Sequence, residues 1–406
     1  GAHLLSSLAA IAMDSASVQY FQWRQGRGGW AQFHGSVIKH DGSTGRPFKA
    51  VTELATSLNA LTALSEPTAR TAGSEDDARP APIAPKVPVA RAAIILDNDS
   101  RWMISQASGP RNDGRRSPVE TAMRHFQEIS CRGVECDVVA PDTSLDGYSL
   151  VVLPMTAYIS PTLAKNLRHI ASRGVPVVAT YFSGVFDRWM RLTEARPPAA
   201  DNGPLGIFGV SVQERDMLYR SQQRQLVWAG GAEGERASVR EYTEQIEAAE
   251  GTTIHARYDD GPFSGEAIIT QRGSAWYVAA RLDDDGLRLL YDRVLPELKR
   301  ADWQTEGVTI YREIGGAQLL FLFNARDYPI SVSLGQVGDR RVAVTKAASV
   351  SAAKYGGTDA LRLAPSALDP ILLNRATLQE EVPGNDGRLC TLESWGTAVF
   401  RLSPRR

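Results

Sequence analysis

The predicted fold rests on the stretch AAIIL at residues 92–96, which runs directly into DNDS at residues 97–100. Five consecutive apolar residues predict a short strand that is buried on both faces. The polar residues that follow mark the carboxyl end of that strand. Because the apolar residues do not alternate with polar ones, the stretch predicts a parallel sheet with helices on both faces.

Three further apolar strands follow, at 134–139, 149–154 and 175–180, with helical segments around 117–130 and 161–173. Short strands that alternate with helices predict a parallel α/β sheet. In such a sheet, ligand or interface residues lie at the carboxyl ends of the strands. We expect these positions to be held by Asp97, Asp99, Pro154 and Ser183.

The amino-terminal part also predicts α/β structure. Apolar spacing predicts a helix at 4–13, a turn at Asp14, an aromatic-rich strand at 18–23 and an amphipathic helix at 48–64. The stretch 65–90 is rich in Pro, Ala and charge, and predicts a linker or exposed insertion.

The carboxyl-terminal part changes to strands. A hairpin is predicted from 267–270 and 275–279, and a helix from 287–299. After residue 305, evenly spaced strands at 308–311, 318–323, 330–334 and 397–402 predict a small β-sandwich.

The composition bounds the functional classes. The 406 residues carry 45 Lys and Arg against 46 Asp and Glu, a net charge of -1, and 43% of them are hydrophobic. This length predicts two or three domains. A balanced charge argues against a nucleic-acid partner, which would need a basic excess or patch. The sequence contains no run of about 18 apolar residues, so it predicts no membrane span.

The three cysteines, Cys131, Cys136 and Cys390, do not form a disulfide framework. Cys131 and Cys136 are too far apart for a CxxC motif, and no nearby His completes a zinc pattern. We therefore predict buried or idle thiols, no metal, no cofactor and a reducing, cytoplasmic location.

The common catalytic motifs are absent from the sequence. It has no G-x-S-x-G elbow, no Walker A loop, no H-E-x-x-H and no G-x-G-x-x-G. Ser183-Gly184 after a predicted strand faintly resembles a nucleophile turn, but the preceding Tyr181-Phe182 favours a structural turn.

The segment at residues 20–35, YFQWRQGRGGWAQFHG, is the most informative for function. Trp23 and Trp30 offer flat faces for sugar C–H surfaces, while Arg24 and His34 can bond hydroxyl groups. A sugar or polyol site is one interpretation. The other is a strand terminus whose aromatic residues fill a core.

The same segment carries a resemblance to a known family. FQWRQxRGGxxxFHG at residues 21–35 resembles the last barrel strand of glycoside hydrolase family 42, which are β-galactosidases. Similar motifs follow in the same order, namely DxDSxW at 97–102, SGVxD at 183–187, GPLxxxFGV at 203–210 and AWYVAARL at 275–282. The resemblance covers essentially the whole chain.

The resemblance implies an α/β architecture of several parts. Residues 1–64 are expected to be the end of a partial (β/α)8 barrel, and 65–90 a linker. Residues 91–304 are expected to form a flavodoxin- or glutamine-amidotransferase-like trimerisation domain, and 305–406 the small β-sandwich. The implied assembly is a homotrimer formed through residues 90–300.

The resemblance also implies an activity, the hydrolysis of terminal β-D-galactosides by a retaining mechanism that uses two Glu residues. In the family both lie on earlier barrel strands. This sequence has no Glu before Glu53, and neither Asp14 nor Asp41 matches a catalytic position. We therefore expect both catalytic carboxylates to lie upstream of the chain start. The chain is then a fragment of a larger enzyme and inactive alone.

The resemblance assigns His34 to the galactoside subsite, with Trp23 and Arg24 helping to shape it, and Trp30 is either a further stacking contact or an exposed loop residue. The family usually has a sugar-contacting Glu three positions before the His, where this sequence has Ala31. Loss of that Glu removes a strong acceptor for sugar hydroxyls. This departure predicts either a different specificity or relaxed constraint.

Other charged residues allow several interpretations. Asp97 and Asp99 could face a neighbour's active site, bind a cation or cap a helix. The run at 283–285 is either a solvated turn or a calcium site. Arg24 and Arg27 could form ion pairs instead of sugar contacts. The isolated histidines are expected to be structural, and they are His125, His169 and His255.

Two other functions compete with the galactosidase fragment. The first is a non-catalytic assembly or carbohydrate-binding module built on the α/β domain and the sandwich. The second is an amidotransferase-like enzyme, which would need a Cys or Ser nucleophile at a tight strand-to-helix turn. The predicted helix around Cys131 and strand around Cys136 argue against the second.

Overall fold

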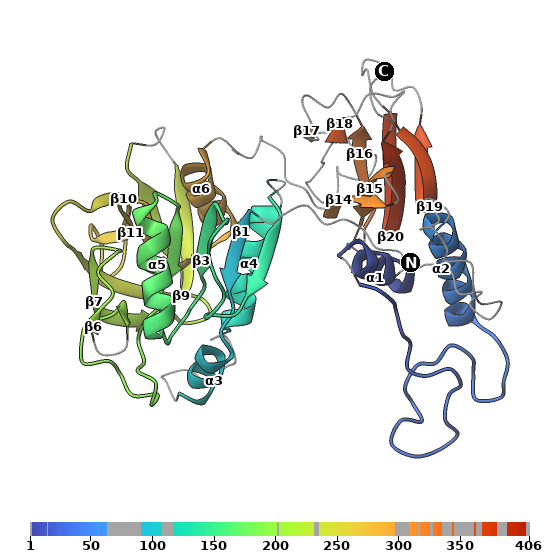
Figure 1. The fold of residues 1–406 in the computed structure, drawn as a ribbon, viewed down its shortest axis with the longest axis horizontal. Coiled ribbons are helices and arrows are strands. Elements are labelled where there is room, and N and C mark those ends of the chain that lie inside the picture. The colour runs from blue at the N-terminus through green and yellow to red at the C-terminus, as the bar shows by residue number, and fades with distance from the viewer. Residues whose placement is uncertain are drawn as a thin grey trace, which may run out of the picture. The chain divides into compact units, whose positions relative to one another are not determined.

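The chain divides into two compact units. Unit 1 contains residues 1–88 and 301–406, and unit 2 contains residues 89–300 (Figure 1). The structure is a computed structural model. It describes residues 2–13, 15–62, 91–107, 117–130, 132, 134–200, 203–230, 235–296, 308–314, 317–324, 328–334, 343–344, 361–362, 368–379 and 388–402. The predicted linker at 65–90 lies outside them, as do Asp14 and Cys131.

Unit 2 is built on the predicted parallel strands. They are β1 (Ala92–Ile95), β2 (Cys136–Val139), β3 (Leu150–Leu153) and β4 (Val177–Thr180), in the order β4-β3-β1-β2 and all parallel. Every residue of β1, β3 and β4 is buried, whereas β2 lies at the edge and is partly exposed. The predicted parallel sheet is confirmed.

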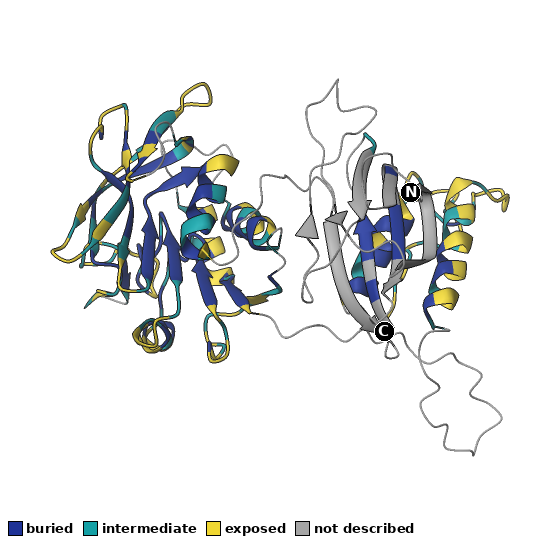
Figure 2. Ribbon diagram, turned by 90° about the horizontal axis from the view of Figure 1, so that it is seen from above, coloured by how far each residue is buried: buried dark blue, intermediate teal, exposed yellow. Residues whose placement is uncertain are grey.

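Helices cover both faces of this sheet. The predicted helices are confirmed as α4 (Pro118–Ser130) after β1 and α5 (Pro161–Ser172) after β3. In the order β4-β3-β1-β2, the chain moves from β1 towards one edge of the sheet to reach β2, and from β3 towards the opposite edge to reach β4. Right-handed crossovers therefore place α4 and α5 on opposite faces. Figure 2 shows the resulting buried strands in dark blue, with exposed residues concentrated on loops and outer helix faces.

Beyond β4 the sheet continues into strands that pair with one another antiparallel, and it contains eleven strands in total. The predicted hairpin is confirmed as β11 (Ala267–Arg272) and β12 (Ala275–Val278), and β12 pairs with β4 in parallel. The remaining strands are β7 (Val210–Met217), β8 (Arg224–Trp228), β9 (Arg236–Ala248), β10 (Thr253–Tyr258) and β13 (Ala280–Leu282). A separate two-strand ribbon joins β5 (Ala199–Ala200) to β6 (Gly203–Pro204).

The predicted helix at 287–299 begins earlier than expected, as α6 (Asp284–Val294). Its N-cap is Asp283, whose carboxylate accepts hydrogen bonds from the backbone N–H groups of Gly286 and Ser238, each within 2.9 Å. The acidic run 283–285 is therefore a helix start, not a solvated turn, because a carboxylate satisfies N–H groups that a helix terminus leaves unpaired.

Unit 1 joins the two ends of the sequence. Its helices are α1 (Ala2–Ala12) and α2 (Arg46–Thr62). Its strands form a five-stranded antiparallel sheet of β14 (Val308–Ile314), β15 (Ala317–Phe323), β16 (Ile330–Leu334), β19 (Leu368–Gln379) and β20 (Arg388–Leu402). A two-stranded ribbon pairs β17 (Ala343–Val344) with β18 (Leu361–Arg362).

The core of unit 1 lies between these helices and the sheet. Leu4 and Leu8 of α1 and Leu61 of α2 share one apolar cluster with Phe321 and Val399 of the strands. In the described residues α1 and α2 pack on the five-stranded sheet, and the β-sandwich at 305–406 stays a prediction. An amphipathic helix can cover the apolar face of a sheet as well as a second sheet can.

The predicted strand at 18–23 is wrong. Phe21 and Trp23 lie in bends, the rest of these residues has no regular structure, and the nearest pairing is one isolated bridge between Arg24 and Ile38. A strand is held by backbone hydrogen bonds to its neighbours, and in the described structure this segment has no neighbouring strand. Across the described residues, no helix combines the length and apolar character needed to cross a membrane.

Candidate functional site

The predicted sugar-contacting segment is the loop at residues 15–45 of unit 1, between α1 and α2. Its aromatic side chains are turned to solvent, because 61% of Trp23, 99% of Trp30 and 89% of Phe33 is exposed. His34 is exposed as well. The aromatic residues therefore do not fill a core, and that interpretation of the segment is wrong for these side chains.

Backbone hydrogen bonds hold the two ends of the segment together, among them those from the N–H of Val37 to the oxygen of Gln22 at 3.0 Å and from the N–H of Ile38 to the oxygen of Trp23 at 2.8 Å. The guanidinium of Arg24 donates two hydrogen bonds to the backbone oxygen of His40, at 3.2 and 2.9 Å, so Arg24 forms no ion pair there. Trp23 meets Phe48 of α2 edge to face, with ring centroids 6.4 Å apart. Tyr20 ties the start of the segment to α1 through a 2.5 Å hydrogen bond with Ser7. Within the described structure no hydrogen bond or ring contact joins the four predicted sugar residues to one another.

Unit 2 offers a second place where ligands would be expected. The strand order reverses between β1 and β3, and open α/β sheets bind ligands at the carboxyl ends of the strands at such a point. Here the chain's own side chains fill that position. Met155 directly after β3 is fully buried, and its N–H donates to the Thr180 hydroxyl at 2.8 Å. The hydroxyl of Ser100 accepts from the N–H of Tyr158 at 3.0 Å.

Ser183 lies in a buried structural turn at the end of β4. Its side chain is fully buried, and its hydroxyl donates to the backbone oxygen of Leu153 at 3.3 Å. The next residue, Gly184, has φ +63°, and a Cβ there would lie 2.3 Å from the oxygen of Ala199. Only glycine fits such a position without strain. The interpretation of Ser183-Gly184 as a structural turn is confirmed, because the Ser183 hydroxyl is not accessible to a substrate.

A buried carboxylate organises the same edge of the sheet. Glu244 of β9 is 1% exposed and accepts hydrogen bonds from the Tyr277 hydroxyl at 2.7 Å, the Arg215 guanidinium at 3.0 Å and the Phe182 N–H at 3.1 Å. Burial and the nearby Glu244 carboxylate raise the pKa of Tyr277 well above its usual value. With donors on both of its oxygens, Glu244 is an anchor for β4, β7, β9 and β12 and not a free acid.

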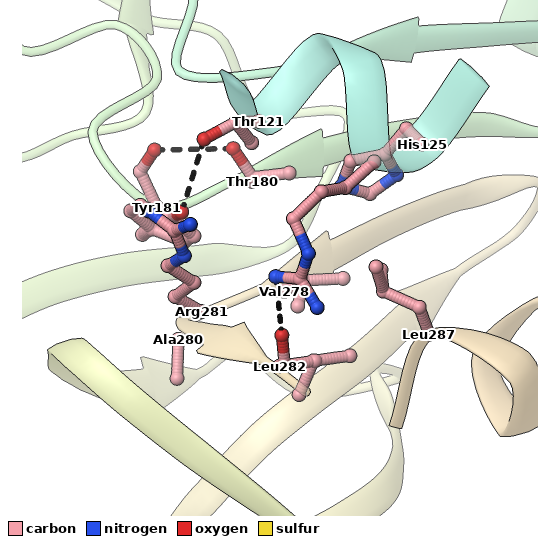
Figure 3. A pocket seen from close by; sticks show the side chains of 10 residues that line it. Thr121, His125, Thr180, Tyr181, Val278, Ala280, Arg281, Leu282 and Leu287 are labelled. Carbon is pink, nitrogen blue, oxygen red and sulfur yellow. Dashed lines mark hydrogen bonds between the residues drawn. The ribbon is translucent and has the colours of Figure 1, made fainter. Parts of the chain in front are cut away.

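A small pocket lies beside this network, between α4, α6 and the ends of β4 and β12 (Figure 3). The empty space in and at the mouth of this pocket is about 230 Å³. Thr121 and Tyr181 line one side and are joined by a 3.2 Å hydrogen bond between their hydroxyls. Burial raises the pKa of Tyr181 to about 12, so the phenol stays protonated.

The cations around this pocket are already paired. Arg281 forms ion pairs with Glu120 and with Glu241, the latter at 2.7 Å. Arg124 donates to the backbone oxygen of Leu282 at 2.6 Å and pairs with Asp284 at 2.8 Å. Since each guanidinium is held by internal acceptors, the pocket offers no free positive charge to an anionic ligand.

Two of the three predicted structural histidines, His125 and His255, are packed into the fold, and His169 is not. His125 is buried and hydrogen bonded to the Tyr291 hydroxyl at 2.7 Å, and burial lowers the pKa of His125 to about 3. His255 stacks on Trp276 with ring centroids 4.3 Å apart, and burial lowers its pKa. His169 lies at the surface, 3.4 Å from the Asp146 carboxylate.

Asp97 is a helix cap. Its carboxylate accepts from the N–H of Asp99 at 3.1 Å and from the N–H and hydroxyl of Ser100 at 2.8 and 2.6 Å, at the start of α3 (Asn98–Gln106). Of the three interpretations, capping is the one that the geometry supports. No cluster of three potential metal ligands occurs in the described part of the chain.

Cys136 does not carry a reactive thiol. Burial raises the pKa of Cys136 to about 12, so its sulfur is not a thiolate at neutral pH. Cys390 lies within β20. The amidotransferase interpretation therefore has no nucleophile, either at Cys136 or at Ser183.

Comparison with known sequences identifies the family. The model described as β-galactosidase trimerisation domain matches residues 90–300, and the model described as β-galactosidase matches residues 1–61. The chain is 34% identical over 305 residues to β-galactosidase BglY of Alicyclobacillus acidocaldarius, covering 73% of this chain and 41% of that protein. It belongs to the family 42 β-galactosidases.

A second relative supports the same family. β-Galactosidase Pbg of Clostridium perfringens is 30% identical over 314 residues, which is 74% of this chain and 42% of that protein. The chain thus spans about two fifths of the length of the curated relatives it matches. The family resemblance stated from the sequence motifs is confirmed.

Solved structures agree on the fold. The crystal structure of the cold-adapted β-galactosidase from Rahnella sp. R3 matches with a TM-score of 0.72 and 25% identity, covering 99% of this chain and 51% of that one. The β-galactosidase from Bacillus circulans sp. alkalophilus matches with a TM-score of 0.71 and 19% identity, covering 98% of this chain and 51% of that one. The second likeness shows the fold alone.

Sequence reasoning missed the Glu244 network. The motif at 275–282 already contained Tyr277 and Arg281, but their acidic partners on β9, Glu244 and Glu241, lie more than thirty residues earlier, and Glu120 of α4 lies earlier still. One signal was present. Glu244 interrupts the apolar side of a long strand, and an acid at such a position needs buried donors.

Proposed function

We propose that this chain is the carboxyl-terminal portion of a β-galactosidase that hydrolyses terminal β-D-galactosides by a retaining double displacement. The observation that carries the proposal is the order of the two family matches, the β-galactosidase model at 1–61 followed by the trimerisation domain at 90–300. In this mechanism one Glu protonates the glycosidic oxygen and a second attacks the anomeric carbon, and water then hydrolyses the glycosyl-enzyme.

We assign both catalytic carboxylates to a part of the enzyme outside these 406 residues. The acids in residues 1–62 are Asp14, Asp41 and Glu53. Asp41 is exposed, and hydrogen bonds from Ser43 lower its pKa, which suits a loop anchor better than a proton donor. Glu53 lies on the exposed face of α2. Neither offers the pair of carboxyl groups about 5–5.5 Å apart that retention requires.

The contribution of this chain to the galactoside subsite is the segment 15–45. His34, Trp23, Arg24 and Trp30 are the proposed contacts, and their exposure leaves them available to a sugar. Ala31 lacks the carboxylate that the family usually has at this position, so we expect His34 and Arg24 to carry the polar contacts. The second contribution is assembly, as a homotrimer through residues 90–300.

A chimaera tests the proposal. Residues 1–406 would replace the stretch of BglY that they match, and the rest of BglY would supply the remainder of the enzyme. We expect the chimaera to hydrolyse p-nitrophenyl β-D-galactoside and this chain alone not to. His34→Ala in the chimaera should raise KM about tenfold, the equivalent of one lost hydrogen bond to the sugar. Lys39→Ala, an exposed neighbour in the same segment, should leave KM unchanged.

Two outcomes would contradict the proposal. A folded chimaera without hydrolysis would show that this chain cannot complete the catalytic barrel. Hydrolysis by this chain alone would place the carboxylates within it.

The second candidate is a non-catalytic assembly or carbohydrate-binding module. The exposure of Trp23 and Trp30 favours it, because exposed tryptophans are suited to stacking on sugars. Titration calorimetry of this chain with galactose separates the two functions. Binding by the chain alone that is lost in Trp30→Ala supports the module.

A further inference from the structure

The proposed sugar contacts Trp30 and His34 lie on one tight turn in the loop between α1 and α2. We call this turn, residues 29–34, the contact turn. Two backbone hydrogen bonds of 3.0 and 3.3 Å shape it, and each of them joins two residues of the turn itself. These bonds therefore set the shape of the contact turn and not its position in the segment.

The side chains of the contact turn do not anchor it. Trp30 is 99% exposed, Phe33 is 89% exposed and His34 is exposed, so none of the three is packed into a core. Three of the four residues between Gln25 and Trp30 are glycine, which has more backbone freedom than any other residue. The chain connection alone does not fix where the turn lies.

Gln25 bridges the contact turn and the stem of the segment, where residues 22–25 are hydrogen bonded to residues 37–38. The backbone N–H of Gln25 donates to the oxygen of Ile38 at 3.1 Å, within the stem. Its side-chain amide donates to the backbone oxygen of Gln32 at 2.8 Å. In the part of the chain that the structure describes, no other side chain is hydrogen bonded to the contact turn.

The position of Gln32 makes this bond effective. Gln32 follows Trp30 by two residues and precedes His34 by two, so a bond to its carbonyl oxygen holds both sugar contacts at once. Neither of the backbone bonds within the turn uses that oxygen. The side chain of Gln25 is partly buried, and a hydrogen bond is stronger where water is partly excluded.

We propose that Gln25 is a positioning residue of the galactoside subsite, which holds Trp30 and His34 where a sugar meets them. It is not a catalytic residue, because its amide bonds the protein backbone and acts on the sugar only through the contact turn. The inference rests on the proposed function of this segment. Contacts that are fixed before binding lose less entropy when the ligand arrives.

Hydrogen exchange of this chain, measured by mass spectrometry on peptides that cover residues 29–35, tests the bond directly. Gln25→Leu keeps most of the side-chain volume and removes the donor, so we expect exchange in these peptides to be about fivefold faster. Gln32→Ala is the matched control, because it removes a side chain and keeps the backbone oxygen that accepts the bond. The control should exchange like the wild type.

The chimaera with BglY gives the functional readout. Gln25→Leu should raise KM about fivefold and leave kcat within about twofold, as expected when binding contacts are displaced and the reacting groups are not. In a chimaera that already carries Trp30→Ala and His34→Ala, Gln25→Leu should have no further effect. The contacts that it positions are then gone, so the losses are not additive.

Three results would overturn the inference. The first is unchanged exchange of the contact turn in Gln25→Leu. The second is faster exchange with an unchanged KM, since the bond would then hold the turn without serving the subsite. The third is an equally large rise in KM without the Trp30 and His34 side chains. A chimaera without hydrolysis in any form counts against the proposed function instead, and exchange of this chain alone still decides whether Gln25 holds the turn.

Discussion

The two units differ in how the sequence builds them. Unit 2 is one continuous stretch, residues 89–300, whereas unit 1 joins residues 1–88 to 301–406. The core of unit 1 places Leu8 against Phe321, more than three hundred residues later. Contacts within a continuous stretch close shorter loops and cost less chain entropy. Unit 2 therefore has what it needs to fold within its own segment, and unit 1 depends on both ends.

The units also differ in how they treat polar and aromatic groups. In unit 2 the carboxylates of Glu244 and Asp187 are buried and hydrogen bonded. In unit 1 the segment 15–45 leaves Trp30 and Phe33 in solvent. Unit 2 thus holds these two acids inside its own hydrogen-bond network, while the segment 15–45 has aromatic side chains suited to further contacts. Substitutions in each unit test this difference.

The largest expected effect is in unit 2. Gly184→Ala would place a Cβ 2.3 Å from the Ala199 oxygen, at a φ of +63°. We expect a loss of about 4 kcal/mol in the free energy of unfolding, from backbone strain and overpacking together. Hydrogen exchange mass spectrometry should show faster exchange in residues 89–300 and unchanged exchange in α1 and α2.

Gly273→Ala is the matched control for that substitution. Gly273 has a similar φ of +57°, with no atom within 4 Å of the added carbon. It should cost only about 1 kcal/mol. Equal losses for the two variants would show that crowding at Ala199 is unimportant.

The next effect tests the shared core of unit 1. Leu8→Ala removes a fully buried side chain of α1 and should cost about 3 kcal/mol. Exchange should accelerate in α1 and also in β15, because both contribute to one cluster. Trp30→Ala is the control, since its side chain is 99% exposed and should change stability by less than about 0.5 kcal/mol. Faster exchange in α1 without any change in β15 would contradict a joint core.

The smallest effect depends on pH and concerns unit 2. Burial lowers the pKa of His125 from 6.5 to about 3, so the folded state keeps the ring neutral. Between pH 6.5 and 4.5 the unfolded chain binds a proton that the folded chain does not. Stability should therefore fall by about 2 kcal/mol over this window. Above pH 6.5 this contribution does not change.

Thermal unfolding of His125→Gln across that window measures this contribution. The variant should lose stability less steeply than the wild type on acidification, and His169→Gln, at the surface, should follow the wild type. Parallel curves for the wild type and His125→Gln would mean that His125 does not take up this proton on unfolding.

The sequence predicted the parallel strands well and the candidate site less well. Apolar runs such as 92–96 became buried strands because burial of both faces is a local property of the sequence. The strand at 18–23 failed because a strand also needs a neighbour, and a neighbour is not a local property. Glu244 was missed for the same reason, since its partners come from distant strands and only the folded sheet brings them together.

The sequence by itself determined the family, the four parallel strands of unit 2 and the absence of a nucleophile motif. These properties follow from periodicity and from residue identities at fixed spacing. The tertiary structure decided that the two chain ends share one core and that Asp97 and Asp283 are helix caps. Those properties depend on which distant segments pack against each other, and local spacing does not determine that packing.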